Sequence, residues 1–75
     1  MNKTRRQQLR KWLEDLEEIK SELESILDDE QDSFDSMPES LQSSDNGMKS
    51  EEAIDQMNEA MDALDEAISC VEEIV

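Results

Sequence analysis

Residues 9–26 read LRKWLEDLEEIKSELESI. The large apolar residues of this stretch are separated by alternating steps of three and four positions. This spacing is typical of an α-helix whose apolar side chains form a seam along one face. In heptad notation the seam has an a column (Leu9, Leu16, Leu23), a d column (Trp12, Ile19, Ile26) and an e column (Leu13, Leu27, Phe34). The apolar stripe is therefore three positions wide.

A second stretch near the C-terminus repeats this alternation of three and four. Its apolar residues are Ile54, Met57, Met61, Leu64, Ile68, Val71 and Val75. A column beside them holds Ala53, Ala60, Ala67 and Ile74. The pattern predicts a second amphipathic helix. Its small alanine side chains allow a neighbouring backbone to approach closely, which suits antiparallel packing.

Capping signals place the first helix at about residues 5–35. Thr4 followed by Gln7 matches a capping box, in which the two side chains bond to each other's backbone amides. No glycine or proline interrupts the stretch before Pro38, which disfavours helical geometry at the residue preceding it.

Residues 36–47 are predicted to connect the helices, because they contain four serines, the only proline and an Asp-Asn-Gly turn signal. Ser36 with Glu39 favours one short helical turn inside this connection. Ser50 is followed by two glutamates, an arrangement typical of a helix N-terminus. We therefore expect the second helix over about residues 48–75.

These elements predict an all-α fold, an antiparallel helical hairpin formed by a single domain over residues 1–75. Two helices close an a/d seam, which leaves the e column of the first helix, Ile74 and the alanines uncovered. We therefore expect the hairpin to dimerise into a four-helix bundle. The predicted oligomer seam comprises Leu9, Trp12, Leu13, Leu16, Ile19, Leu23, Ile26, Leu27, Phe34, Ile54, Met57, Met61, Leu64, Ile68 and Val71.

The composition argues against catalysis. The chain has 22 acidic residues against 7 basic ones, a net charge of −15, no histidine and no tyrosine. Acid–base chemistry near neutral pH relies mainly on histidine or on deeply buried carboxylates, of which a chain this short can hold very few. We expect no enzyme activity and no cofactor.

Metal sites are also not expected. Zinc sites lack their usual ligands, since the chain has no histidine and only Cys70, which falls on an outward-facing position and reads as a spectator thiol. Residues 28–39 partly match a calcium-binding loop, with acids at Asp28, Glu30, Asp32 and Glu39. The position that needs glycine for a sharp turn is Ser33, so the match is incomplete.

The sequence predicts a cytoplasmic protein. A lone cysteine cannot form an internal disulfide, so nothing requires an oxidising compartment. The basic residues 1–11 are not followed by the apolar core of a signal peptide, and no apolar run approaches the ~18–20 residues of a membrane span.

Charge is divided unequally along the chain. Residues 1–11 contain five cations and no acid, whereas residues 12–75 contain two cations and all 22 acids, a net of −20. In one interpretation Glu72, Glu73 and the terminal carboxylate neutralise the basic segment. In the other, the segment binds an external anion such as a nucleotide, helped by serines from the connection of a second, antiparallel copy. The candidate anion-binding residues are Arg5, Arg6, Arg10, Lys11, Ser40, Ser43 and Ser44.

The acidic body also allows two interpretations. It is either a solvated face that keeps the protein soluble or a surface that binds a strongly basic partner. The candidate surface comprises Glu14, Asp15, Glu17, Glu18, Asp28, Asp55, Glu59, Asp62, Asp65 and Glu66. Among the positions that flank the seams, only Lys20 opposes the acids, so complementary pairing between helices is absent. Direct binding to DNA or RNA would need the opposite sign of charge.

Two segments carry a resemblance: TRRQQL over residues 4–9 and DEQDSFDSMPESLQ over residues 29–42. With them the chain resembles small acidic helical-hairpin proteins encoded in phage and prophage genomes. The resemblance implies a viral protein in the host cytoplasm. It further implies a stoichiometric inhibitor of host defence or transcription, acting by DNA mimicry or by sequestering signalling nucleotides.

The sequence therefore leaves three functions open. The leading expectation is a non-enzymatic homodimer that binds a basic surface on another protein. The alternative is an oligomeric sponge for a nucleotide or another phosphorylated ligand. The third is a purely structural assembly bundle without an external ligand.

Overall fold

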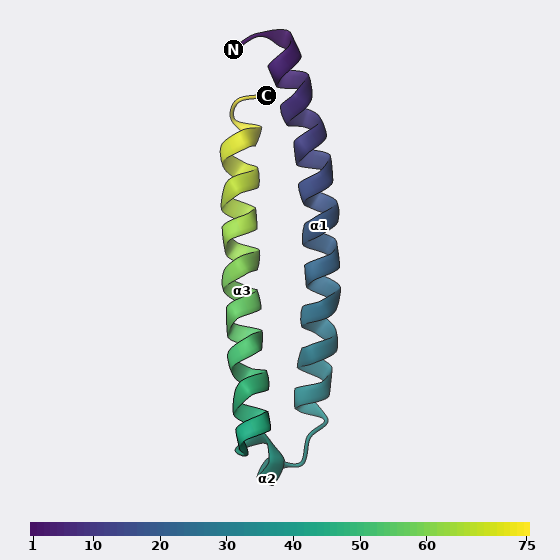
Figure 1. Ribbon diagram of the computed structural model, residues 1–75, viewed down its shortest axis with the longest axis vertical. Coiled ribbons are helices and arrows are strands. Elements are labelled where there is room, and N and C mark those ends of the chain that lie inside the picture. Colours follow the sequence, from purple (N-terminus) through teal and green to yellow (C-terminus); the bar gives the residue numbers. More distant parts are fainter.

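The computed structural model describes all 75 residues as an all-helical rod with Cα extents of 58 × 15 × 13 Å. Helix α1 spans Lys3–Asp35, the short α2 spans Glu39–Gln42, and α3 spans Asp45–Glu72. Helices α1 and α3 run side by side in opposite directions, joined at one end by α2 (Figure 1). The predicted all-α helical hairpin is confirmed.

Helix α1 begins two residues before the predicted start. Its N-cap is Asn2, whose side-chain oxygen accepts a hydrogen bond from the backbone amide of Arg5 at 2.8 Å. The prediction of Thr4 as the cap was wrong, because asparagine two positions earlier already satisfies an unpaired amide of the first turn. At the other end Ser36 caps the helix, and its hydroxyl donates to the carbonyl oxygen of Asp32 at 2.8 Å.

The connection is shorter than expected. Ser44 caps α3 by accepting from the Gly47 amide at 3.3 Å, so the Asp-Asn-Gly sequence forms the first turn of α3 and not a loop. Ser50, predicted as the cap, lies buried inside the helix. The predicted short turn appears as α2, but its N-cap is Pro38 without a side-chain hydrogen bond.

The face of α3 turned toward α1 matches the predicted seam. Ile54 and Ile68 are buried, and the apolar residues between them are half-buried. The face of α1 differs from the prediction. Its e column, Leu13, Leu27 and Phe34, is half-buried together with the a column.

The d column of α1 remains outside the hairpin. Trp12, Ile19 and Ile26 are 41%, 52% and 57% exposed. The expectation that the d column closes the hairpin while the e column stays uncovered was therefore wrong. The a and e columns also alternate by four and three, and the polar members of this seam, Lys20 and Glu30, both find partners on α3.

Candidate functional site

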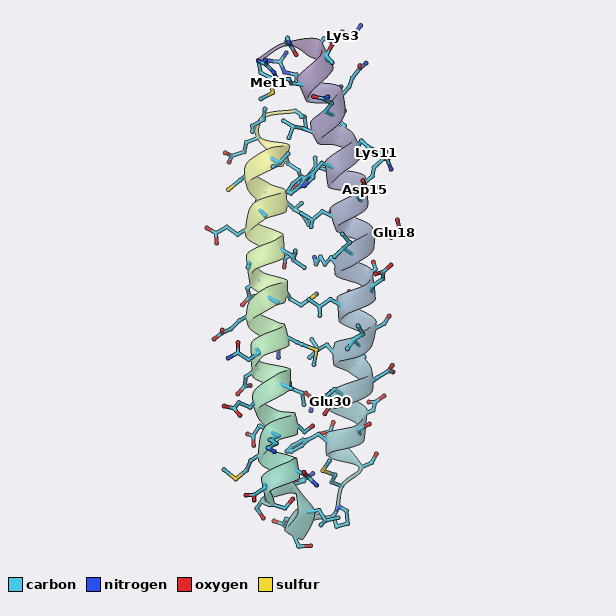
Figure 2. The ribbon with its side chains drawn as sticks, in the orientation of Figure 1. Met1, Lys3, Lys11, Asp15, Glu18 and Glu30 are labelled. Atoms are coloured by element: carbon cyan, nitrogen blue, oxygen red, sulfur yellow. The ribbon has the colours of Figure 1, made fainter.

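All ten residues of the candidate acidic surface are exposed. They lie on α1 and α3, outside the seam between the helices. Figure 2 shows Asp15 and Glu18 on the side of α1 that points away from α3, whereas Glu30 lies between the two helices. The structure thus arranges the carboxylates along both helices and gathers them into no enclosed pocket.

Only two of the 22 acids form salt bridges. Asp15 pairs with Lys11 at 2.7 Å, one turn apart on α1, and Asp65 of α3 pairs with Lys20 of α1. The hydrogen bond to Asp15, with the charge of that carboxylate, raises the pKa of Lys11. The hydrogen bond to Asp65 raises the pKa of Lys20 in the same way. No other carboxylate forms a salt bridge.

One acid has a specific polar partner across the hairpin. Glu30 is half-buried, and its Oε1 accepts a hydrogen bond of 2.5 Å from the hydroxyl of Ser50 on α3. Together with the Lys20–Asp65 pair, this contact fixes the register of α1 against α3. It gives Glu30 a structural role that is separate from the exposed acids.

The arginines of the basic segment have no partners. Arg5, Arg6 and Arg10 are exposed, and none forms a salt bridge, including with Glu72 or Glu73. Neutralisation by the C-terminal acids is therefore not realised as an ion pair. Figure 1 shows that the first turn of α1, which contains Arg5 and Arg6, extends beyond the end of α3.

The two halves of the candidate anion site lie at opposite ends of the hairpin. The arginines are at the free end of α1, and the serines are at the connection (Figure 1). The hydroxyl of Ser43 lies 3.4 Å from the carbonyl oxygen of Glu39, and the hydroxyl of Ser44 donates to that of Leu41. Within one chain the structure does not bring these residues together.

The clefts of the surface are shallow. The largest, about 420 Å³, lies at the connection and is lined by Phe34, Glu39, Gln42, Ser43, Met48 and Glu51. Its two carboxylates and lack of a cation make it unsuited to an anion. Another, about 340 Å³, lies at the free end of α1 and is lined by Met1, Arg5, Gln8, Leu9 and Trp12. This cleft adjoins the exposed d column.

No group of three or more acidic or cysteine side chains is placed to hold a metal ion. Asp28, Glu30 and Asp32 belong to α1, so the partial match to a calcium-binding loop falls within a continuous helix. Cys70 is free and exposed, as its outward position predicted. Neither long helix has an apolar stretch sufficient to cross a bilayer.

Sequence reasoning missed the roles of Gly47 and Ser50. Both are buried on the seam face of α3. The signal was present, because positions 47 and 50 continue the alternation of three and four that leads to Ile54. Because these positions hold a glycine and a serine, a search for large apolar side chains does not recognise them as part of the seam.

No protein-family model, curated protein or solved structure matches this chain.

Proposed function

We propose that this protein is a non-enzymatic binding protein whose carboxylate-rich surface docks onto a strongly basic surface of another protein. The observation that carries the proposal is the lack of internal charge pairing, since only Asp15 and Asp65 among 22 acids have a cationic partner. Unpaired like charges on a rod repel one another, so a cationic partner is attracted over a long range and relieves this repulsion on binding.

The spacing of the charges supports a partner that normally binds nucleic acid. Twenty-two carboxylates along a 58 Å rod amount to about one per 2.6 Å. Duplex DNA carries about one charge per 1.7 Å of its axis. The spacing of carboxylates is thus of the same order as the spacing of phosphates, so carboxylates can take the place of phosphates in a basic groove.

The full proposal includes the assembly and the biological setting. The chain acts as a homodimeric four-helix bundle in the cytoplasm, where it inhibits a host defence or nucleic-acid-binding protein as a viral protein. The uncovered d column, Trp12, Ile19 and Ile26, supports the dimer, since apolar side chains gain free energy when removed from water.

Affinity capture with the full chain tests the proposal. The immobilised protein is expected to retain a basic protein from a lysate of its source cells at low salt, and excess duplex DNA is expected to displace it. Salt of about 1 M, which shortens the Debye length to about 3 Å, is expected to release it.

The matched variant for this capture is Asp55→Asn/Glu59→Gln/Asp62→Asn, which removes three exposed charges of α3 and keeps the side-chain sizes. It is expected to retain less of the partner. Retention that is unchanged in 1 M salt and in this variant would contradict the electrostatic mechanism.

A second candidate function is binding of a nucleotide or another phosphorylated ligand. The observation that favours it is that Arg5, Arg6 and Arg10 are exposed and free of ion pairs. A thermal-shift measurement across nucleotides distinguishes this candidate, because a ligand at 100 times its Kd adds about 2.7 kcal/mol of stability. The shift is expected to disappear in Arg5→Ala/Arg6→Ala.

The third possibility, a structural bundle without an external ligand, predicts neither capture nor a thermal shift. Both experiments therefore also distinguish it from the two binding functions.

A further inference from the structure

One face of the hairpin is apolar across both helices. On α1, Lys20 lies at the edge of the seam that is farther from the d column, because the a column separates the two around the helix. On α3, Asp65 and the alanine column, Ala53, Ala60, Ala67 and Ile74, also lie on opposite sides of the seam. Since Lys20 pairs with Asp65, that ion pair closes one edge of the seam. The d column and the alanine column therefore border the other edge together.

This face is also nearly free of charge on α3. The column next to the alanines holds Lys49, Gln56, Ala63 and Cys70, all exposed. No carboxylate of α3 occurs in either column, although acids occupy most of the remaining outward positions of the helix. A helix with this many acids has kept one sector free of them and lined largely by small or apolar side chains, which is the pattern of a face that packs against protein.

We propose that a second copy of this chain covers this face, with α1 of one copy antiparallel to α1 of the other. The inference deepens the dimerisation included in the proposed function and rests on it. Trp12, Ile19 and Ile26 are spaced seven apart, so the stripe is symmetric about Ile19. In the dimer Ile19 meets its own counterpart, and Trp12 meets Ile26 of the other copy.

Charge complementarity identifies the occupant as this same chain. In the register centred on Ile19, residues 3–11 of one copy lie along residues 27–35 of the other. The first segment carries five cations and no acid, and the second carries four exposed acids and no cation, because Glu30 is turned into the seam. Arg5 continues the d column of the first segment, and Asp29 flanks the d column of the second, so these two residues lie at the interface itself. The first turn of α1 contains no acid to oppose the positive end of its own helix dipole. The acids of the second copy supply that missing negative charge at both ends of the dimer.

The same charges decide the orientation. If α1 of one copy lay over α3 of the other, both basic ends would meet at one end of the dimer. Both acidic connections would then meet at the other end and repel each other. With α1 against α1, each basic end lies beside an acidic one. Asp15 and Glu22 of the two copies approach each other near the centre, and Asp15 is already paired with Lys11.

Sedimentation equilibrium of the full chain at micromolar concentration tests the face. The wild-type protein is expected to be a dimer. Ile19→Gln/Ile26→Gln is expected to raise the dimer Kd about 100-fold or more, because four apolar side chains per dimer are lost. Met48→Gln is the matched control, since Met48 is 60% exposed but lies off this face. A monomeric wild type, or a dimer unaffected by the double substitution, would overturn the proposal.

Disulfide trapping tests the orientation without removing the stripe. In a Cys70→Ser background, Ile19→Cys is expected to cross-link to itself within the dimer under mild oxidation. Glu17→Cys, on the opposite side of α1, is expected to remain monomeric on a non-reducing gel. A dimer in which Cys introduced at position 19 does not cross-link would exclude the antiparallel α1 pairing.

These results are separable from the function. If Ile19→Gln/Ile26→Gln is monomeric and helical by circular dichroism yet still captures the basic partner, the dimer interface stands and the function does not need it. If capture fails while cross-linking succeeds, the proposed function falls and the interface stands.

Discussion

Gly47 shows how a single missing side chain shapes the connection. It is buried at the start of α3, and a Cβ atom there would overlap the backbone carbonyl oxygens of Leu41 and Gln42. Because the obstacle is backbone, no side-chain rotation relieves it. The glycine is required by close packing of α2 and not by a positive φ angle, since the chain has none.

Gly47→Ala is therefore expected to destabilise the protein by about 1–3 kcal/mol, the usual cost of overpacking. A loss of stability would indicate this overlap, because in an unobstructed helix alanine is more stable than glycine by about 1 kcal/mol. Urea unfolding monitored by circular dichroism measures the change. The exposed neighbour provides the control, and Asn46→Ala is expected to stay within about 0.5 kcal/mol of wild type. A stabilised Gly47→Ala would refute the packing of α2 on α3.

Lys20 gives the hairpin a dependence on alkaline pH. Its hydrogen bond to Asp65 raises the pKa of Lys20 in the folded state. The stabilisation is complete below the unfolded-state pKa of about 10.4 and is lost as the pH rises through the raised value. We expect the melting temperature of wild type to fall more steeply above pH 10.4 than that of Lys20→Met.

The control for this comparison is Lys49→Met, because Lys49 is exposed and has no salt bridge. Its melting temperature is expected to follow the wild-type dependence on pH. If the melting temperatures of wild type and Lys20→Met change identically with pH above about 10.4, the Lys20–Asp65 pair does not contribute to stability.

At the scale of the elements, the start of α1 depends on one side chain. Asn2 accepts the backbone hydrogen bond of Arg5, and Thr4 lies within the first turn without a capping contact. Asn2→Ala is expected to cost about 1 kcal/mol, whereas Thr4→Ala is expected to cost much less. Thermal unfolding of both variants checks this difference. The reverse order would place the cap at Thr4.

The sequence could predict that both long helices exist but not which side of α1 faces α3. Leu9, Leu16 and Leu23 form a complete seam with either of two neighbouring columns, since both combinations alternate by three and four. The d column is wholly apolar, so the sequence favoured it as the column that faces α3. The structure uses the e column, whose Lys20 is balanced by Asp65 and whose Phe34 packs at the connection.

At the scale of the whole molecule, charge opposes folding. A net charge of −15 is carried on a rod only 15 × 13 Å across, so like charges remain close even when exposed. Salt shortens the range of this repulsion, with a Debye length of about 30 Å at 0.01 M and about 3 Å at 1 M. The folded state, which concentrates the charge, gains most from screening.

We therefore expect the melting temperature to rise between 0.01 M and 1 M sodium chloride. A gain of about 1 kcal/mol corresponds to about 4–8 °C for a domain of this size. Sodium sulfate at equal ionic strength is the comparison, because it also strengthens apolar burial and is expected to raise the temperature further. A melting temperature that falls as salt is added would mean that ion pairs dominate over repulsion.

The candidate site was only partly accessible to sequence. Exposure of the acids followed from their positions outside the apolar seam, and the structure has them there. The lack of an ion pair at Arg5 and Arg6 did not follow, because it depends on how far the first turn of α1 extends past α3. Such an offset is set by the connection and by contacts such as Ser50 with Glu30.

The amino-acid order alone determined that two amphipathic helices form, fold back on each other and present carboxylates to water, because helical periodicity and charge are local properties. The tertiary structure alone decided that Trp12, Ile19 and Ile26 stay uncovered. In the arrangement that forms, two pairs of polar residues meet across the seam. Those pairs lie 45 and 20 positions apart in the chain, Lys20 with Asp65 and Glu30 with Ser50, so no local pattern contains them.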